Sequence, residues 1–193
     1  MRKCQISNIS VTPRFCITIA AMLLLLPTDW LFGWFIAVLI HEAGHVFALT
    51  ICRHKIHAIV FDHTGIVMKT DPMHPAQEIF CALAGPVIGL GPLLVASLFP
   101  HTSVCALILS CFNMIPVYPL DGGRVVNGIL QLIFDPLTAA AIKKFITKAT
   151  YIILGILVMI AAFKFKIVLP LLLAAIILIF RSIQENFLAN KQL

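Results

Sequence analysis

Long apolar stretches, separated by short polar or proline-containing segments, follow one another along most of the chain. Most approach the roughly 20 apolar residues that an α-helix needs to cross the hydrocarbon core of a bilayer. We therefore expect about six membrane-spanning helices. They cover residues 12–27, 30–53, 76–99, 102–118, 149–163 and 167–184.

The region between the second and third predicted helices has a different pattern. Residues 56–61 and 66–69 are short runs rich in Ile and Val, and residues 62–65 between them are typical of a turn. This pattern predicts a β-hairpin over residues 56–69. Residues 121–148 mix apolar and basic residues with Gly122, Gly123 and Pro136, and we expect no membrane-spanning helix there.

The composition excludes an ordinary soluble protein. Hydrophobic residues make up 61% of the 193 residues, charged residues make up 11%, and the mean hydropathy is +1.03. A soluble fold of this length needs far more polar surface. We predict an all-α polytopic membrane protein with a small membrane-associated β-hairpin, formed as a single domain over residues 1–193.

The distribution of basic residues predicts the orientation of this domain. The formal net charge is +6, but the basic residues lie between apolar stretches and not along one face, so we expect no nucleic-acid partner. Six spans place both termini on one side, which then carries twelve of the fourteen Lys and Arg residues; the other side has Lys164 and Lys166. Cytoplasmic loops are enriched in Lys and Arg. We therefore expect a multi-pass protein of the cell membrane with both termini in the cytoplasm.

Residues 41–45 read His-Glu-Ala-Gly-His within the second apolar stretch. On a helix, positions i and i+4 share a face, so His41 and His45 can bind one metal ion. Glu42 lies one position further round the turn and can act on a metal-activated water. Ionisable side chains at membrane depth are functional by default. The motif predicts one hydrolytic Zn²⁺ per chain, in a site that opens toward the cytoplasm.

Catalytic zinc usually has three protein ligands and one open position. The candidates for the third ligand are His54, His57, Asp62, His63, Asp71, His74, Glu78, Asp121 and Asp135. Asp121 stands apart because Pro116 and Pro119, just before it, stop a regular helix. Non-helical chain at membrane depth is tolerated only where it is buried in protein or lines a wet cavity. From the spacing alone, a zinc ligand and an ordinary turn aspartate both remain open.

The two motifs together carry a resemblance to a known family. The His-Glu-x-x-His helix, combined with Asn-x-x-Pro-x-x-Pro-Leu-Asp-Gly-Gly at residues 113–123, resembles the site-2 protease family of intramembrane zinc metalloproteases. This resemblance implies a metalloendopeptidase in which Glu42 is the general base and His41, His45 and Asp121 bind Zn²⁺. The compact six-helix layout resembles the branch that processes sporulation sigma factors.

The resemblance also implies roles outside the metal ligands. Asn113, together with Pro116 of the same motif, is expected to contact substrate. Ala84-Gly85-Pro86 matches a further family motif, and Gly85 and Gly89 have the small-xxx-small spacing that lets helices approach closely. We therefore expect the third predicted helix to pack tightly against the second and to support its histidines.

The expected partners are the lipid bilayer and a membrane-tethered protein or peptide substrate, such as a pro-sigma or anti-sigma factor. A regulatory membrane protein acting in trans is left open. The hairpin over residues 56–69 either offers an edge strand to an unwound substrate or merely links two helices. No PDZ or cystathionine-beta-synthase-type domain is expected. The alternative function is that of a metal-binding or metal-transporting membrane protein, in which Glu42 has no clear task.

Overall fold

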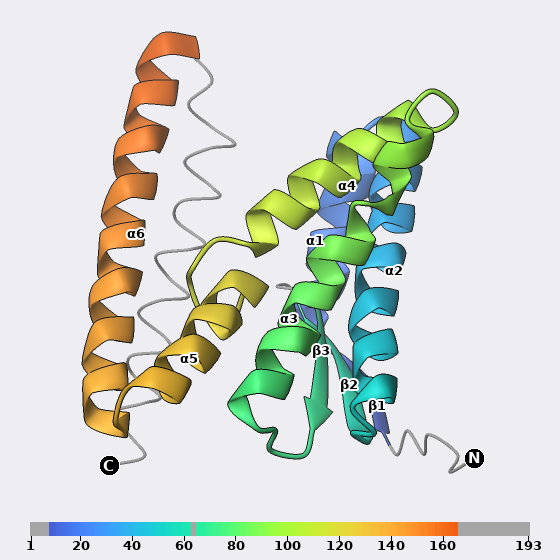
Figure 1. Ribbon diagram of the computed structural model, residues 1–193. Helices are drawn as coiled ribbons and strands as arrows, with labels where there is room; N and C mark the ends of the chain where they lie inside the picture. Colours follow the sequence, from blue (N-terminus) through green and yellow to red (C-terminus); the bar gives the residue numbers. More distant parts are fainter. Residues whose placement is uncertain (1–7, 63–64, 166–193) are drawn as a thin grey trace. The chain divides into compact units, whose positions relative to one another are not determined.

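The computed structural model describes residues 8–62 and 65–165, with side chains described as far as residue 160. Ten elements follow in order: β1 (Asn8–Val11), α1 (Pro13–Leu25), α2 (Thr28–Ile51), β2 (Ile56–Asp62), β3 (Gly65–Thr70), α3 (Pro75–Gly89), the 3-10 helix η1 (Gly91–Val95), α4 (Pro100–Asn113), α5 (Asp121–Ile133) and α6 (Pro136–Phe165). The described chain is therefore mostly helical, with one small sheet (Figure 1). One compact unit ends at Ala139 and a second begins at Ala140, within α6.

Helix α2 is the centre of the first unit. Helices α3 and α4 both pack against α2, and α5 packs against α3 (Figure 1). Small buried side chains line these contacts: Ala37, Cys105 and Ala106 form one cluster, and Ala48 and Cys81 belong to another. Small residues let helix backbones approach closely, which is how helices pack inside a bilayer.

The outer surface of these helices is apolar. Large hydrophobic side chains on α1, α2 and α4 are strongly exposed, among them Leu24, Phe32 and Phe47. Within the described residues, Thr28–Ile51 and Pro75–Val95 are long and apolar enough to cross a membrane, by length and composition. A count of six membrane-spanning helices remains a prediction, and residues 167–184 lie outside the described part of the chain.

Several helix ends follow from local sequence. Thr12 caps α1, since its hydroxyl accepts a hydrogen bond from the backbone N–H of Phe15, and α1 ends before Pro27. Helix α4 ends at Asn113 and not at residue 118 as predicted. The reason is Pro116, whose ring and missing N–H are incompatible with a continuing helix.

Two other predicted helices have different bounds. The third, expected over residues 76–99, is α3 up to Gly89 followed by η1, because Gly91 and Pro92 interrupt the α-helical pattern. The fifth, expected over residues 149–163, is part of the 30-residue helix α6, which begins at Pro136. The basic residues near its start concealed this extension. Residues 121–133 form the separate helix α5.

The predicted hairpin is confirmed, and it belongs to a larger sheet. Strands β2 and β3 pair antiparallel, with Val60 opposite Val67. Strand β1, which the sequence pattern does not predict, pairs parallel with β2, so the order is β1-β2-β3. The hydroxyl of Thr12 donates to Oδ1 of Asp62 at 2.8 Å and joins the end of β1 to the end of β2. Strand β3 is therefore one edge of the sheet.

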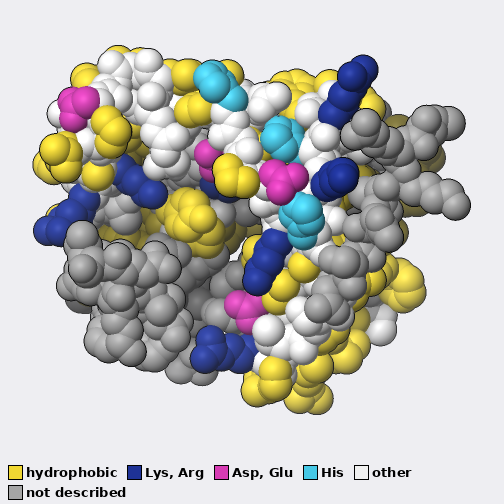
Figure 2. Space-filling view, turned by 90° about the horizontal axis from the view of Figure 1, so that it is seen from below, with side chains coloured by type: hydrophobic (Ala, Val, Ile, Leu, Met, Phe, Trp, Pro, Cys, Tyr) yellow, Lys and Arg dark blue, Asp and Glu magenta, His cyan; other side chains and the backbone are white. Residues whose placement is uncertain are grey.

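Figure 2 shows the end of the molecule at which the connections from α2 to β2 and from β3 to α3 lie. Charged and histidine side chains gather on this face among apolar ones. The two connections contribute exposed Arg53, Lys55, Asp71 and His74. This polar end contrasts with the apolar flanks of α1, α2 and α4.

Candidate metal centre

Three side chains that are distant in sequence meet beside α2. Nε2 of His41 lies 3.1 Å from Oδ2 of Asp121, Nε2 of His45 lies 3.2 Å from the same oxygen, and the two Nε2 atoms are 3.2 Å apart. The residues are 3%, 9% and 5% exposed for His41, His45 and Asp121, respectively. One nitrogen from each imidazole and one carboxylate oxygen thus form a nearly equilateral triangle in the protein interior.

The first side of this triangle is a consequence of helical geometry. His41 and His45 lie one turn apart on the buried face of α2. Their rings meet edge to face, with centroids 4.9 Å apart. The helix therefore places both imidazole rings on the same side, within reach of one point.

Asp121 reaches that point because α4 ends early. The chain turns through residues 114–120, with Val117 buried, and Asp121 begins α5. The backbone of Gly122 lies against Met114, and that of Gly123 lies against Val117 and Tyr118, so closely that a Cβ at either glycine would collide with them. The two glycines therefore let the start of α5 fold back onto the loop and turn Asp121 inward.

Helix α3 fixes the orientation of His45. Nδ1 of His45 lies 2.8 Å from the backbone carbonyl of Cys81, and a carbonyl only accepts, so Nδ1 is the donor. In the neutral ring, Nε2 then carries a lone pair that faces the triangle. A Cβ on Gly85 would collide with the His45 ring, and one on Gly44 would lie 2.5 Å from the carbonyl oxygen of Ala84. The expected tight packing of this helix pair is confirmed.

The donor set fits a metal ion of the zinc type. Tetrahedral coordination with bonds of ~2.0–2.1 Å places neighbouring ligand atoms ~3.3 Å apart, close to the three separations observed here. Two imidazole nitrogens and a carboxylate oxygen are ordinary zinc ligands. The bare Nε2 of neutral His45 cannot donate a hydrogen bond to Asp121, whereas a cation between them satisfies both. His41, His45 and Asp121 can hold one metal ion.

The second oxygen of Asp121 faces a cation from its own helix. Nη1 of Arg124 lies 3.5 Å from Oδ1 of Asp121, and Nε of Arg124 lies 3.8 Å from Oε1 of Glu78 on α3. Arg124 is thus placed between the two carboxylates. This arrangement orients Asp121 so that Oδ2 remains directed at the histidines.

Glu42 is half-buried on the same turn of α2 as His41. It directly follows His41 in the chain and lies between the two histidines in sequence. It is not one of the three residues of the metal-ligand group. Its position is compatible with proton transfer beside a metal ion.

The other residues considered as a third ligand make different contacts. Nε2 of His57 lies 2.8 Å from Oδ1 of Asp71, and Asp135 accepts hydrogen bonds at the start of α6. The remaining described candidates contact residues outside the cluster as well: His54 contacts Gln77, Asp62 contacts Thr12, His74 contacts Ala76, and Glu78 contacts Arg124. His63 lies outside the described residues.

The two predicted substrate contacts are not brought into the triangle. Nδ2 of Asn113 donates to the backbone carbonyl of Leu109, one turn earlier on α4. Pro116 is half-buried in the loop between α4 and α5. Both residues lie on the chain that leads to Asp121, and their contact with substrate remains a prediction.

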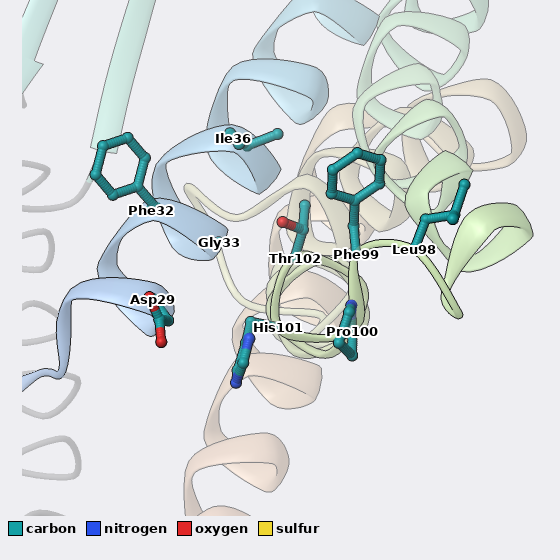
Figure 3. A pocket seen from close by; sticks show the side chains of 9 residues that line it. All are labelled: Asp29, Phe32, Gly33, Ile36, Leu98, Phe99, Pro100, His101 and Thr102. Carbon is teal, nitrogen blue, oxygen red and sulfur yellow. The ribbon is translucent and has the colours of Figure 1, made fainter.

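A separate pocket lies at the other end of α2. It has a volume of about 330 Å³ and is lined by the starts of α2 and α4, including Asp29, Phe32, Gly33 and His101 (Figure 3). The His101 ring contacts Trp30 edge to face, with centroids 4.9 Å apart. No residue of the metal-ligand triangle lines this pocket.

Two features of the site were not foreseen from the sequence. Arg124 was counted only as a basic residue, although its i+3 spacing from Asp121 on a helix was a usable signal. The carbonyl of Cys81 has no sequence signal, because any residue supplies one. It is the crossing of α2 and α3 that makes this carbonyl a partner of His45.

The fold and site define a helical protein of membrane character with a buried two-histidine, one-aspartate metal centre. The model of peptidase family M50 matches residues 93–158. The zinc metalloprotease MJ0392 of Methanocaldococcus jannaschii is 30% identical over 134 residues, which cover 62% of this chain and 40% of that protein. The solved structure of a site-2 protease from the same organism matches with a TM-score of 0.65 and 24% identity, over 96% of this chain and 94% of that one.

The family model agrees with the resemblance seen in the sequence, the curated relative agrees with the expected metal, and the solved structure agrees with the fold. Residues 93–158 are similar to peptidase family M50, and the curated relative is a zinc metalloprotease. The fold of the chain is that of the solved site-2 protease. The aligned region spans 40% of the length of the curated relative, which is the longer protein.

Proposed function

We propose that this protein is a zinc-dependent intramembrane endopeptidase that cleaves a membrane-embedded or membrane-tethered protein. The observation that supports this proposal most strongly is the triangle of His41, His45 and Asp121 beside Glu42 on an apolar helix. A metal-binding triangle alone fits many proteins. Hydrolysis also needs a group that accepts a proton from water, and Glu42 supplies a carboxylate that is not one of the three ligands.

The proposed chemistry assigns one task to each side chain. His41, His45 and Asp121 hold Zn²⁺, and Glu42 is the general base. The bound metal supplies Lewis acidity that polarises the scissile carbonyl and activates water. Glu42 accepts the proton of the attacking water and passes it to the leaving nitrogen. Arg124 keeps Asp121 oriented, and the Cys81 carbonyl keeps the Nε2 lone pair of His45 directed at the metal.

The proposed setting is the cell membrane, with six spans and both termini in the cytoplasm. The polar end in Figure 2 supports this orientation, since Arg53 and Lys55 directly follow α2. His45 lies eight residues before Arg53, which corresponds to ~12 Å along a helix. The metal centre is then below the membrane surface and reaches water from the cytoplasmic side.

The proposed substrate is unwound before cleavage, because a peptide bond within a helix is shielded by its own hydrogen bonds. Strand β3 supports this step: it lies at an edge of the sheet, and Val67 is exposed on it. In this proposal Asn113 and Pro116, on the chain that leads to Asp121, also contact the unwound segment. A membrane-tethered pro-sigma or anti-sigma factor fits this description, and a regulatory membrane protein in trans is a further proposed partner.

The decisive experiment is co-expression of the protein with tethered candidate substrates, comparing wild type with Glu42→Gln. We expect the substitution to lower the cleavage rate by roughly 10²–10⁴-fold, the usual contribution of a general base. Zinc content measured on the purified variant should equal that of wild type, because Glu42 is not a ligand. Asp29→Asn, at an exposed carboxylate near the start of the same helix and outside the metal-ligand group, is a matched control for the charge change.

Two outcomes would contradict the proposal. Equal cleavage by wild type and Glu42→Gln removes Glu42 as the base. Zinc uptake into proteoliposomes that depends on His41, without cleavage of any tethered substrate, supports the alternative of a metal transporter.

A further inference from the structure

Two buried polar atoms next to the metal centre have no hydrogen-bond partner within the described residues. They are Nδ1 of His41 on α2 and the hydroxyl oxygen of Ser110 on α4. Ser110 is 2% exposed and His41 is 3% exposed. Buried polar atoms in native proteins are nearly always paired with protein or water, so two of them side by side indicate a shared interaction.

Both atoms face the same place. A Cβ built on Gly89, at the end of α3, would lie 3.0 Å from the Ser110 oxygen and 3.2 Å from Nδ1 of His41. The glycine therefore leaves open a small space between α2, α3 and α4 that both polar atoms border. Because each atom lies within 3.2 Å of that one point, the two are at most about 6 Å apart.

The chemistry of His41 requires an acceptor at this place. Nε2 of His41 faces the metal-ligand triangle, so in the neutral ring the proton is on Nδ1. Histidines that bind metals almost always donate this second N–H to an acceptor, which fixes the tautomer and the ring orientation. His45 has such an acceptor in the carbonyl of Cys81. For His41, the hydroxyl oxygen of Ser110 is the side-chain acceptor that borders the same space as Nδ1.

We propose that Ser110 is a positioning residue for the metal centre. Its hydroxyl accepts the hydrogen bond of Nδ1–H of His41, either directly or through one water held in the space beside Gly89. This holds the His41 ring with its Nε2 lone pair on the metal. The proposal rests on the metal centre of the proposed function and adds a residue on α4 that neither motif contains.

The test measures zinc affinity by chelator competition in the Glu42→Gln background, so that no result depends on turnover. Ser110→Ala should weaken zinc binding by about 10–100-fold, the usual effect of removing such a supporting partner. Ser110→Thr retains a hydroxyl and should keep an affinity close to that of the background protein. The control is Ser103→Ala on the same helix, a buried serine whose hydroxyl is hydrogen-bonded to the carbonyls of Pro92 and Phe99.

Gly89→Ala provides a second, independent variant. Its methyl group would lie 3.0 Å from the Ser110 oxygen and 3.2 Å from Nδ1 of His41, and it should weaken zinc binding as Ser110→Ala does. If both substitutions break one interaction, the double variant should lose little more affinity than the weaker-binding single variant. Full additivity of the two effects would overturn the proposal.

Other results separate this proposal from the proposed function. If the Glu42→Gln protein binds one zinc and Ser110→Ala binds it with equal affinity, Ser110 has no positioning role and the metal centre stands. If Ser103→Ala and Ser110→Ala lower affinity equally, the effect is a general loss of α4 packing and the proposal fails. If the background protein binds no zinc, the proposed function itself fails.

Discussion

Nε2 of His45 lies 3.2 Å from Oδ2 of Asp121, although 76 positions separate the two residues in the chain. The contact depends on two local events. Helix α2 presents His45 on its buried face, and the chain leaves α4 at Asn113 early enough to bring Asp121 to the start of α5. The placement of His45 and the end of α4 are set locally and independently. The packing of the helices is what brings His45 and Asp121 together.

Asp121→Ala should lower zinc affinity by at least about 10–100-fold. Loss of a residue that only supports a ligand usually has an effect of this size, and Asp121 is proposed to be a ligand itself. His41→Ala should do the same. Metal content per purified chain and chelator competition give the measurement. Asp71→Ala and His101→Ala are the matched controls, because neither residue belongs to the triangle. Unchanged zinc content in Asp121→Ala would remove Asp121 from the ligand set.

Gly85→Ala should both destabilise the protein and weaken zinc binding. A Cβ at this position would collide with the His45 ring, and overpacking of this kind costs about 1–3 kcal/mol. Thermal unfolding in detergent and zinc titration measure the two effects. Gly155→Ala on α6 is the control, because a Cβ there meets no described atom within 4 Å. Wild-type zinc affinity in Gly85→Ala would show that α3 does not hold His45 in place.

Removal of the metal should lower the thermal stability of the wild-type protein. A ligand that binds only the folded state stabilises it by about 2.7 kcal/mol when its free concentration is 100 times its Kd. Zinc added to the chelated protein should therefore raise the melting temperature, and cleavage should return in parallel. His41→Ala should show no such rise. An equal rise in both proteins would place the zinc elsewhere.

Val67→Pro should reduce cleavage of a tethered substrate without changing zinc content. Proline removes a backbone N–H from β3 and is poorly tolerated within paired strands. Val67→Thr keeps the N–H and is the matched control. Ile59 is a less specific target, since β2 lies between β1 and β3 and proline there disturbs the sheet itself. Unchanged cleavage in Val67→Pro would show that the hairpin only links two helices.

The three residues that the structure brings together could be singled out from sequence because each is tied to a local pattern. The i, i+4 spacing of His41 and His45 fixes one face of a helix, and Pro116 and Pro119 mark a break just before Asp121. The convergence of the two motifs rested on family resemblance. Spacing alone gave no way to choose Asp121 over an ordinary turn aspartate.

The parts that sequence patterns missed depend on tertiary contacts or on competing signals. Strand β1 has only four residues and pairs with β2, a partner distant in sequence. The start of α6 was hidden by lysines, which suggest a loop in a membrane protein although they are good helix formers. The roles of Cys81 and Ser110 emerge only where helices cross, whereas the i+3 spacing of Arg124 from Asp121 is a local signal.

The contact between Gly44 on α2 and Ala84 on α3 limits how this molecule can move. Because the two backbones are so close, α2 and α3 cannot slide along one another without displacing His45, whose Nδ1 is hydrogen-bonded to the Cys81 carbonyl on α3. For the proposed endopeptidase, this means that a path for a polypeptide to the metal centre does not run between α2 and α3, because separating these two helices would displace His45.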